Sequence, residues 1–271
     1  MGSSKAPTIG VFDSGFGGLT VLKALLEVIP AADYAYFGDT ARLPYGSKSA
    51  ETVAKYAVEA STFLEKQGAG ILVIACNTAT ALALDTIRRA SSVPVVGVID
   101  PGAERASTLS QSRKAVVIAT EATVGSHAYL KALESRGMRA IEKACPLLVP
   151  LVEEGWVDHT VTEQIARIYL QEAFAGGFES ADVLLLGCTH YPLIKPLLQR
   201  VVPSGVTIVD SAESTARVVA QQLGSPAAAQ SPDFATEVRF FATDSVAKFQ
   251  RLGARFLGRA IDEVRHVDLR E

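Results

Sequence analysis

The sequence predicts an α/β protein with two similar lobes, each built on a mainly parallel sheet flanked by helices. Three observations support this fold class. Short apolar runs alternate with amphipathic stretches, the alternation recurs after about 110 residues, and in both copies a cysteine follows a strand. We expect a pseudo-twofold relation between the lobes, with the active site in the cleft between them, outside the carboxyl ends of the strands.

Several apolar runs predict strands that are buried on both faces, because they lack the polar alternation of half-buried strands. In chain order they are residues 8–13, 33–38, 70–76, 94–100, 114–120, 182–188 and 206–210. Amphipathic stretches, such as residues 19–29 and 50–67, predict helices that cover the sheets. A further strand is predicted within "EVRFFATDS", residues 237–245.

The repeat is clearest at the two cysteines, where "ACNT" at residues 75–78 corresponds to "GCTH" at residues 187–190. The preceding helix, loop and strand have the same length in both copies. Any two strand–helix–strand units look alike, but several matches at a nearly constant offset favour an internal duplication.

Weaker correspondences extend the repeat. They place Asp100 against Asp210, and Asp13 roughly against Thr120. We therefore assign residues 1–99 and 210–271 to a discontinuous first lobe and residues 100–209 to the second.

Composition excludes several classes of protein. The 271 residues carry 26 Lys and Arg against 29 Asp and Glu, a net charge of −3 without the basic footprint of a nucleic-acid or membrane binder. No apolar segment is long enough for a membrane span or a signal peptide. We expect a cytoplasmic protein that acts on a small molecule. The three widely spaced cysteines indicate reduced thiols rather than disulfides or a zinc site.

The placement of Cys76 and Cys188 indicates more than packing. A buried free cysteine is commonly inert. At the carboxyl end of a strand, however, the N–H groups of a following helix lower the pKa of a thiol. If the lobes face each other, the two thiols flank one cleft, and proton-transfer groups on opposite faces of a carbon permit racemisation. Thiol–disulfide exchange and metal binding are alternative functions for the two thiols, but they would use only part of this symmetric arrangement.

Other polar residues follow the same strands. Asp13 and Ser14 lie in "FDSGFGG", a glycine-rich turn that either presents N–H groups to an anion or serves packing alone, with Asp13 as a helix cap. His190 is expected to tune Cys188 or to shuttle its proton, unless it is a core histidine. Thr120 and Thr123 either cap a helix or bind a ligand.

One polar loop and the third cysteine are interpreted differently from each other. The loop "FGDTARLPYGSKS" has the composition of a recognition loop, and its position after a strand favours a functional role over an ordinary connection. Cys145 has no counterpart in the other copy of the repeat, and we interpret it as structural.

These motifs together resemble a known family. "GVFDSGFGGLTVL", "YFGDTARLPYGSKS", "VIACNTATA", "ACPLLVPLVEEGW", "LLLGCTHYPL" and "VDSAES" are similar, in order and over nearly the whole chain, to the motifs of glutamate racemases in the aspartate/glutamate racemase superfamily. The resemblance implies cofactor-independent interconversion of L- and D-glutamate, without pyridoxal phosphate or metal, that supplies D-glutamate for peptidoglycan.

The resemblance also implies residue roles. Cys76 would take the proton from D-glutamate with help from Asp13, and Cys188 would take it from L-glutamate with help from His190. Glu153 would contribute near Cys188, although adjacent Glu154 leaves that assignment open. The implied substrate-binding residues are Asp13, Ser14, Tyr45, Gly46, Asn77, Thr78, Thr120, Thr123, Thr189 and His190.

Two alternatives remain open at this point, namely a racemase for aspartate or another amino acid and a binding protein. Some relatives bind DNA gyrase, but no residue pattern indicates this here, and we expect no direct contact with nucleic acid. We expect a homodimer. Since little sequence precedes the first strand, we expect no activation by a UDP-linked peptidoglycan precursor, which some members link to an N-terminal extension.

Overall fold

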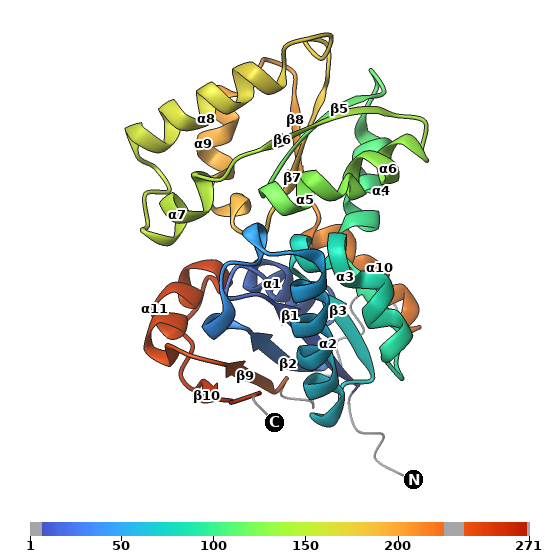
Figure 1. Ribbon diagram of the computed structural model, residues 1–271, viewed down its shortest axis with the longest axis vertical. Coiled ribbons are helices and arrows are strands. Elements are labelled where there is room, and N and C mark those ends of the chain that lie inside the picture. Colours follow the sequence, from blue (N-terminus) through green and yellow to red (C-terminus); the bar gives the residue numbers. More distant parts are fainter. Residues whose placement is uncertain (1–6, 225–235, 270–271) are drawn as a thin grey trace.

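The computed structural model describes residues 7–224 and 236–269. It has two lobes stacked along the long axis of the molecule, each with one sheet (Figure 1). Every strand pair within these residues is parallel. The predicted two-lobed α/β fold is confirmed.

The sheet of the first lobe contains strands from both ends of the chain. Its order is β10-β9-β2-β1-β3-β4, so β9, a strand that the sequence predicted, joins this sheet and pairs with β2. Its central strand β1 is buried along its whole length, which explains the unbroken apolar run. The strands are β1 (Thr8–Asp13), β2 (Asp33–Gly38), β3 (Ile71–Ile74), β4 (Val95–Gly97), β9 (Val238–Ala242) and β10 (Arg265–His266).

The sheet of the second lobe has the order β6-β5-β7-β8. This order matches β2-β1-β3-β4 of the first lobe strand for strand, as an internal duplication requires. β3 and β7, the strands before the two thiols, therefore occupy equivalent positions. The strands are β5 (Lys114–Ala119), β6 (Arg139–Ala144), β7 (Val183–Gly187) and β8 (Thr207–Asp210).

Helices cover both faces of the first sheet. Buried residues of α2 and α3 pack on one face, and those of α1, α10 and α11 pack on the other. The predicted helix at residues 50–67 begins after Ser49, whose side chain accepts a hydrogen bond from the Thr52 N–H. The helices are α1 (Leu19–Val28), α2 (Ala50–Lys66), α3 (Asn77–Ala90), α10 (Ala212–Gln222) and α11 (Val246–Leu257).

The second sheet is covered in the same way. Helices α4 and α6 pack on one face and α7, α8 and α9 on the other, as Figure 1 shows for the upper lobe. The helices are α4 (Ile99–Leu109), α5 (Glu121–Ser126), α6 (Ala128–Glu134), α7 (Leu148–Glu153), α8 (Thr160–Ala173) and α9 (Lys195–Val201). Three short 3₁₀ turns complete the described elements: η1 (Thr40–Arg42), η2 (Tyr45–Ser47) and η3 (Tyr191–Ile194).

One predicted strand ends early. The apolar run at residues 94–100 continues past β4 into α4, which begins at Ile99. Pro101 lies in the first turn of that helix. Backbone N–H groups of the first turn have no acceptor within the helix, so a proline there costs no hydrogen bond. Asp100 is therefore helical and exposed, whereas Asp210 is the last residue of β8 and half-buried. One residue is in a helix and the other ends a strand, so the predicted correspondence between Asp100 and Asp210 is wrong.

Candidate active site

A cavity of about 400 Å³ lies between the lobes, at the carboxyl ends of the strands. Both Cys76 and Cys188 line it. Of the predicted site residues, those that line the cavity are Ser14, Tyr45, Gly46, Cys76, Asn77, Thr78, Thr120, Glu153, Cys188, Thr189 and His190.

Cys76 is the N-cap of α3. Its Sγ accepts a hydrogen bond from the Ala79 N–H at 3.4 Å and donates one to the Ser14 hydroxyl at 3.5 Å. The Ala79 N–H lowers the pKa of Cys76, as the sequence predicted for the N–H groups of this helix, and the Ser14 hydroxyl does so when it donates to the sulfur. Burial and the nearby carboxyl of Asp13 outweigh them and raise the pKa of Cys76 to about 12. The sequence predicted a lowered pKa for this thiol, and that prediction is wrong.

Asp13 ends β1 behind Cys76 and is almost fully buried. Its Oδ2 accepts a hydrogen bond from the Gly15 N–H at 2.9 Å, while its Oδ1 has no partner among the described residues. Asp13 is not the N-cap of α1, which begins after Gly18, but its bond with the Gly15 N–H caps the turn before that helix, the other structural role that the sequence allowed. Burial raises the pKa of Asp13, against the opposing charge of His190. The structure thus brings a proton-accepting carboxyl to the side of the first thiol.

Cys188 lies beside a buried histidine and a carboxylate. Its Sγ is 3.9 Å from His190 Nδ1, and His190 Nε2 is 3.4 Å from Glu153 Oε1. Burial alone would lower the pKa of His190, but its contacts with Cys188 and Glu153 raise it to about 10. Burial would raise the pKa of Glu153, but His190 and Lys248 lower it. Glu153 makes the ion pair with His190, although Glu154 also lines the cavity.

Aromatic rings enclose the histidine. The rings of Phe256 and Phe16 lie with their centroids 5.1 and 6.1 Å from that of His190. These two side chains come from the first lobe, whereas His190 follows β7 of the second. The environment of Cys188 therefore depends on contacts between the lobes.

Three threonines form a cluster of hydroxyl groups where the lobes meet. Thr78 Oγ1 lies 3.0 Å from Thr120 Oγ1 and 3.2 Å from Thr123 Oγ1, and the last two are 2.9 Å apart. Thr120 is also the N-cap of α5, so both of its predicted roles are compatible with its position. Thr123 is fully buried behind the other two and does not line the cavity. It can orient their hydroxyl groups but is not positioned to contact a ligand.

The residues at or behind the cavity that were not predicted to belong to the site include Cys145, Lys248, Asp39 and Tyr129. Cys145, which we interpreted as structural, and Lys248 line the cavity. Asp39 and Tyr129 are fully buried next to predicted site residues, bonded to Tyr45 and Asn77. For Cys145, the only signal in the sequence was its position after the edge strand β6. Asp39 lies within the predicted recognition loop and is bonded to Tyr45 of the same loop, whereas Tyr129 and Lys248 contact segments distant in the chain, which no local motif reveals.

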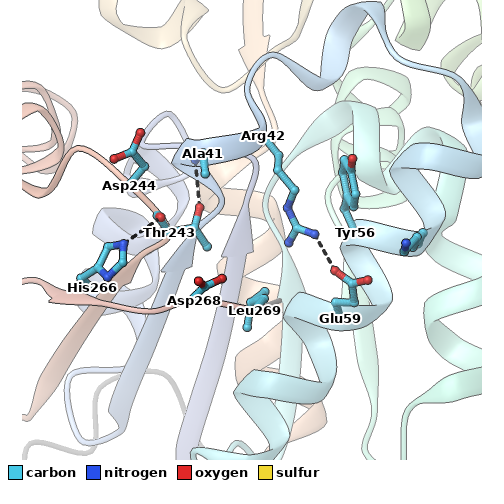
Figure 2. A pocket seen from close by; sticks show the side chains of 10 residues that line it. Ala41, Arg42, Tyr56, Glu59, Thr243, Asp244, His266, Asp268 and Leu269 are labelled. Carbon is cyan, nitrogen blue, oxygen red and sulfur yellow. Dashed lines mark hydrogen bonds and ion pairs between the residues drawn. The ribbon is translucent and has the colours of Figure 1, made fainter. Parts of the chain in front are cut away.

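A second cavity, of about 640 Å³, lies on the first lobe (Figure 2). Two hydrogen-bonded pairs line it, as the dashed lines in the figure show. Arg42 bonds to Glu59, and the His266 ring bonds to the backbone oxygen of Thr243. Its lining contains no cysteine, and Arg42 and Glu59 in its wall form an ion pair. The inter-lobe cavity is therefore the candidate active site, although it is the smaller of the two.

All three cysteines are free thiols. Within residues 7–224 and 236–269, no cluster of three or more His, Cys, Asp or Glu side chains could hold a metal ion. No helix in the same ranges is long and apolar enough to cross a membrane.

The site as a whole combines one buried thiol from each lobe with different assisting groups. On one side is Cys76 with Asp13, and on the other Cys188 with the His190–Glu153 pair. The class of protein is thus a two-lobed parallel α/β fold with one buried thiol from each lobe at the cavity between the lobes.

Comparison with known proteins gives this class a family. Residues 9–219 match the model of the Asp/Glu/Hydantoin racemase family. The chain is 57% identical to the glutamate racemase of Koribacter versatilis, with 98% of this chain and 99% of the relative covered. It is 46% identical to that of Geobacter metallireducens, with 96% of each covered. The chain belongs to the Asp/Glu/Hydantoin racemase family and is an isomerase.

The solved structures agree in fold. The glutamate racemase of Francisella tularensis, solved in complex with D-glutamate, superposes with a TM-score of 0.87 at 34% identity, with 98% of each chain covered. The similarity in fold therefore extends over both lobes.

Proposed function

We propose that this protein interconverts L-glutamate and D-glutamate by proton transfer between the substrate α-carbon and two thiols. The observation that carries the proposal is the equivalent placement of Cys76 and Cys188, which follow matching strands of the two sheets and line one cavity. One thiolate removes the α-proton, and the opposite thiol returns a proton to the other face, which inverts the configuration. In the proposal, Cys76 serves D-glutamate and Cys188 serves L-glutamate.

The difficult step is removal of a proton from an α-carbon that already bears a carboxylate. Fixed donors must stabilise the negative charge that develops on this carboxylate in a site that excludes water. Donors of this kind line the cavity as the hydroxyls of Ser14, Thr78 and Thr189 and as the amide of Asn77. We propose that they hold the carboxylates and ammonium of the substrate, together with Tyr45, Gly46 and Thr120.

The thiols must lose protons before they can act as bases. The pKa of Cys76, raised to about 12 by burial and by Asp13, indicates that this thiol holds its proton until another charge lowers the pKa. Bound substrate places its ammonium group near the thiols, and a positive charge at short range lowers a thiol pKa. In the proposal, Asp13 accepts the proton of Cys76, while His190, held by Glu153, exchanges a proton with Cys188.

Glutamate is preferred over aspartate as the substrate because relatives named glutamate racemases match nearly the full chain at up to 57% identity. A panel of L-amino acids compared by kcat/KM tests this choice. A higher value with L-aspartate than with L-glutamate would refute it.

The wider role follows the family. We propose that the enzyme supplies D-glutamate for peptidoglycan in the cytoplasm and acts as a homodimer. We also propose lobe boundaries at residues 1–99 with 210–271, and 100–209. These boundaries are supported by the sheet membership of β1–β4, β9 and β10 on one side and β5–β8 on the other.

The deciding experiment follows circular dichroism of L-glutamate and, separately, D-glutamate in deuterated water. We expect both signals to decay to zero with deuterium at the α-carbon. Cys76→Ser and Cys188→Ser should each lose at least about a hundredfold in kcat/KM. Because the enantiomers have equal free energy, each loss must be equal in both directions. A folded wild-type protein that leaves both enantiomers optically unchanged would refute the proposal.

A further inference from the structure

Tyr129 links the two thiol-bearing strand ends, although it lies outside every motif described above. It is on α6 of the second lobe and is fully buried. Its hydroxyl donates a hydrogen bond of 2.6 Å to Oδ1 of Asn77, the residue that follows Cys76 in the first lobe. Asn77 is itself buried and lines the catalytic cavity. The bond thus crosses from one lobe to the other directly behind the first thiol.

The ring of Tyr129 contacts the other thiol-bearing segment. A Cβ added to Gly187 would lie 3.0 Å from Tyr129 Cε2 and 2.9 Å from the Cβ of Ala119. The ring therefore packs directly against the backbone of Gly187, which precedes Cys188, and a larger residue there would displace it. One side chain contacts both cysteine-bearing segments, with its ring on one and its hydroxyl on the other.

The hydrogen bond has a chemical consequence for Asn77. A carboxamide presents an acceptor oxygen at one end and an NH₂ donor at the other, and its direction is fixed by its partners. Because Oδ1 accepts from Tyr129, the Nδ2 donors are left for the cavity, where a carboxylate needs them. Burial, opposed by a contact with Ser211, raises the pKa of Tyr129. The hydroxyl therefore remains a neutral donor across the working pH range.

We propose that Tyr129 is a positioning residue that fixes the Asn77 amide with its NH₂ toward a substrate carboxylate. This inference rests on the proposed function, which gives Asn77 a substrate to bind. Without the hydroxyl, the amide could turn its oxygen toward the carboxylate, and the two groups would repel each other.

The test is Tyr129→Phe, which removes the hydroxyl and keeps the ring packed on Gly187. We expect kcat/KM for glutamate to fall about tenfold, the effect of one buried hydrogen bond. In an Asn77→Ala background, the same substitution should change kcat/KM by less than about twofold. The matched control is Tyr34→Phe. Tyr34 is also fully buried, but its hydroxyl bonds to the backbone oxygens of Leu25 and Ile29, away from the site.

The control should lose stability and keep its kcat/KM. Unchanged kcat/KM in Tyr129→Phe would overturn the proposal, as would equal losses in the wild-type and Asn77→Ala backgrounds, which indicate a purely structural role. A second cycle measures unfolding by denaturant without substrate, where we expect Tyr129→Phe and Asn77→Ala to be less than additive. Additive effects on the free energy of unfolding would contradict the hydrogen bond between the Tyr129 hydroxyl and Asn77. Since this cycle needs no catalysis, failure of the wild type to racemise glutamate would refute the proposed function and leave the bond independently tested.

Discussion

The two thiols have different partners, and this difference is clearest at His190. Its pKa is raised to about 10 by Cys188 and Glu153 against the effect of burial. A histidine with a raised pKa stabilises the fold fully below the unfolded value of about 6.5 and loses this effect as pH rises through about 10. Glu153 has a lowered pKa, so its contribution is lost instead as pH falls.

We predict that Glu153→Gln lowers the pKa of His190 toward its ordinary value, because the anion 3.4 Å from Nε2 is removed. The free energy of unfolding, measured from pH 6 to 10, should then decline at lower pH than in the wild type. Glu154→Gln is the control, since this neighbour also lines the cavity but does not hold His190. Equal shifts in the two variants would contradict the assignment of Glu153.

The sequence predicted both thiols because each follows a buried strand within a distinctive motif. It did not predict the pKa of Cys76, because a helix N-terminus is visible in the sequence while burial and the approach of Asp13 are not. It also placed Thr123 at the substrate, where the structure has it one layer deeper. Residue type and spacing thus indicate which groups gather at a site, and packing decides what each of them faces.

At the scale of elements, the segment between β2 and α2 is held by one buried carboxylate. Asp39, which is fully buried, accepts hydrogen bonds from the Tyr45 hydroxyl at 2.5 Å, from Thr243 Oγ1 at 2.9 Å and from Arg42 Nε at 2.9 Å. Tyr45 and the following Gly46 line the catalytic cavity. The anchor of the predicted recognition loop is therefore Asp39, at the carboxyl end of β2.

We predict that Asp39→Asn destabilises the protein by about 2 kcal/mol and raises KM for glutamate severalfold. The new NH₂ group cannot accept from Tyr45 or Thr243, and Arg42 loses one of its two carboxylates. Urea unfolding and steady-state kinetics measure both effects. Glu59→Gln is the matched control, because it removes the other carboxylate bound to Arg42 (Figure 2) without touching Tyr45. Its KM should remain at the wild-type value, and a matching rise would contradict the role of Asp39.

Two of the four edge strands, β6 and β10, were not predicted from the sequence. β6 lies at the edge of the second sheet, and its residues are half-buried or exposed rather than buried. β10, at the edge of the first sheet, is two exposed residues long. Neither strand has the buried apolar run that marked β4 and β8, the two edge strands that were predicted.

At the scale of the whole molecule, the repeat in the sequence predicted the lobes, but not what joins them. The matching strand orders follow from the duplication, which a single chain can reveal through its internal spacing. The contacts between the lobes do not repeat. They include Tyr129 with Asn77, and Lys248 of α11 in the first lobe with Glu153 of α7 in the second. Such contacts depend on how the lobes are set against each other, which no local pattern encodes.

The ion pair between Lys248 and Glu153 connects the two lobes electrostatically. Lys248 Nζ lies 3.5 Å from Glu153 Oε2, so a charge from the first lobe acts on the carboxylate that holds His190 in the second. The other charged groups around Glu153 are His190, adjacent Glu154 and Arg255, whose guanidinium lies against Gly155. Because Lys248 is half exposed, its loss should change the free energy of unfolding by less than about 1 kcal/mol.

Its effect on catalysis should be easier to detect. Lys248 contributes to the lowered pKa of Glu153, so Lys248→Met raises that pKa, and the acid limb of the kcat/KM profile moves to higher pH. Lys248→Arg should restore the profile, and Arg251→Met should leave it unchanged, since it removes an exposed charge from the same helix. High salt should move the wild-type profile toward that of Lys248→Met, because screening weakens a half-exposed ion pair. An acid limb that is the same in Lys248→Met and the wild type would mean that the lobes are coupled at Cys188 through packing alone, by the rings of Phe16 and Phe256 around His190.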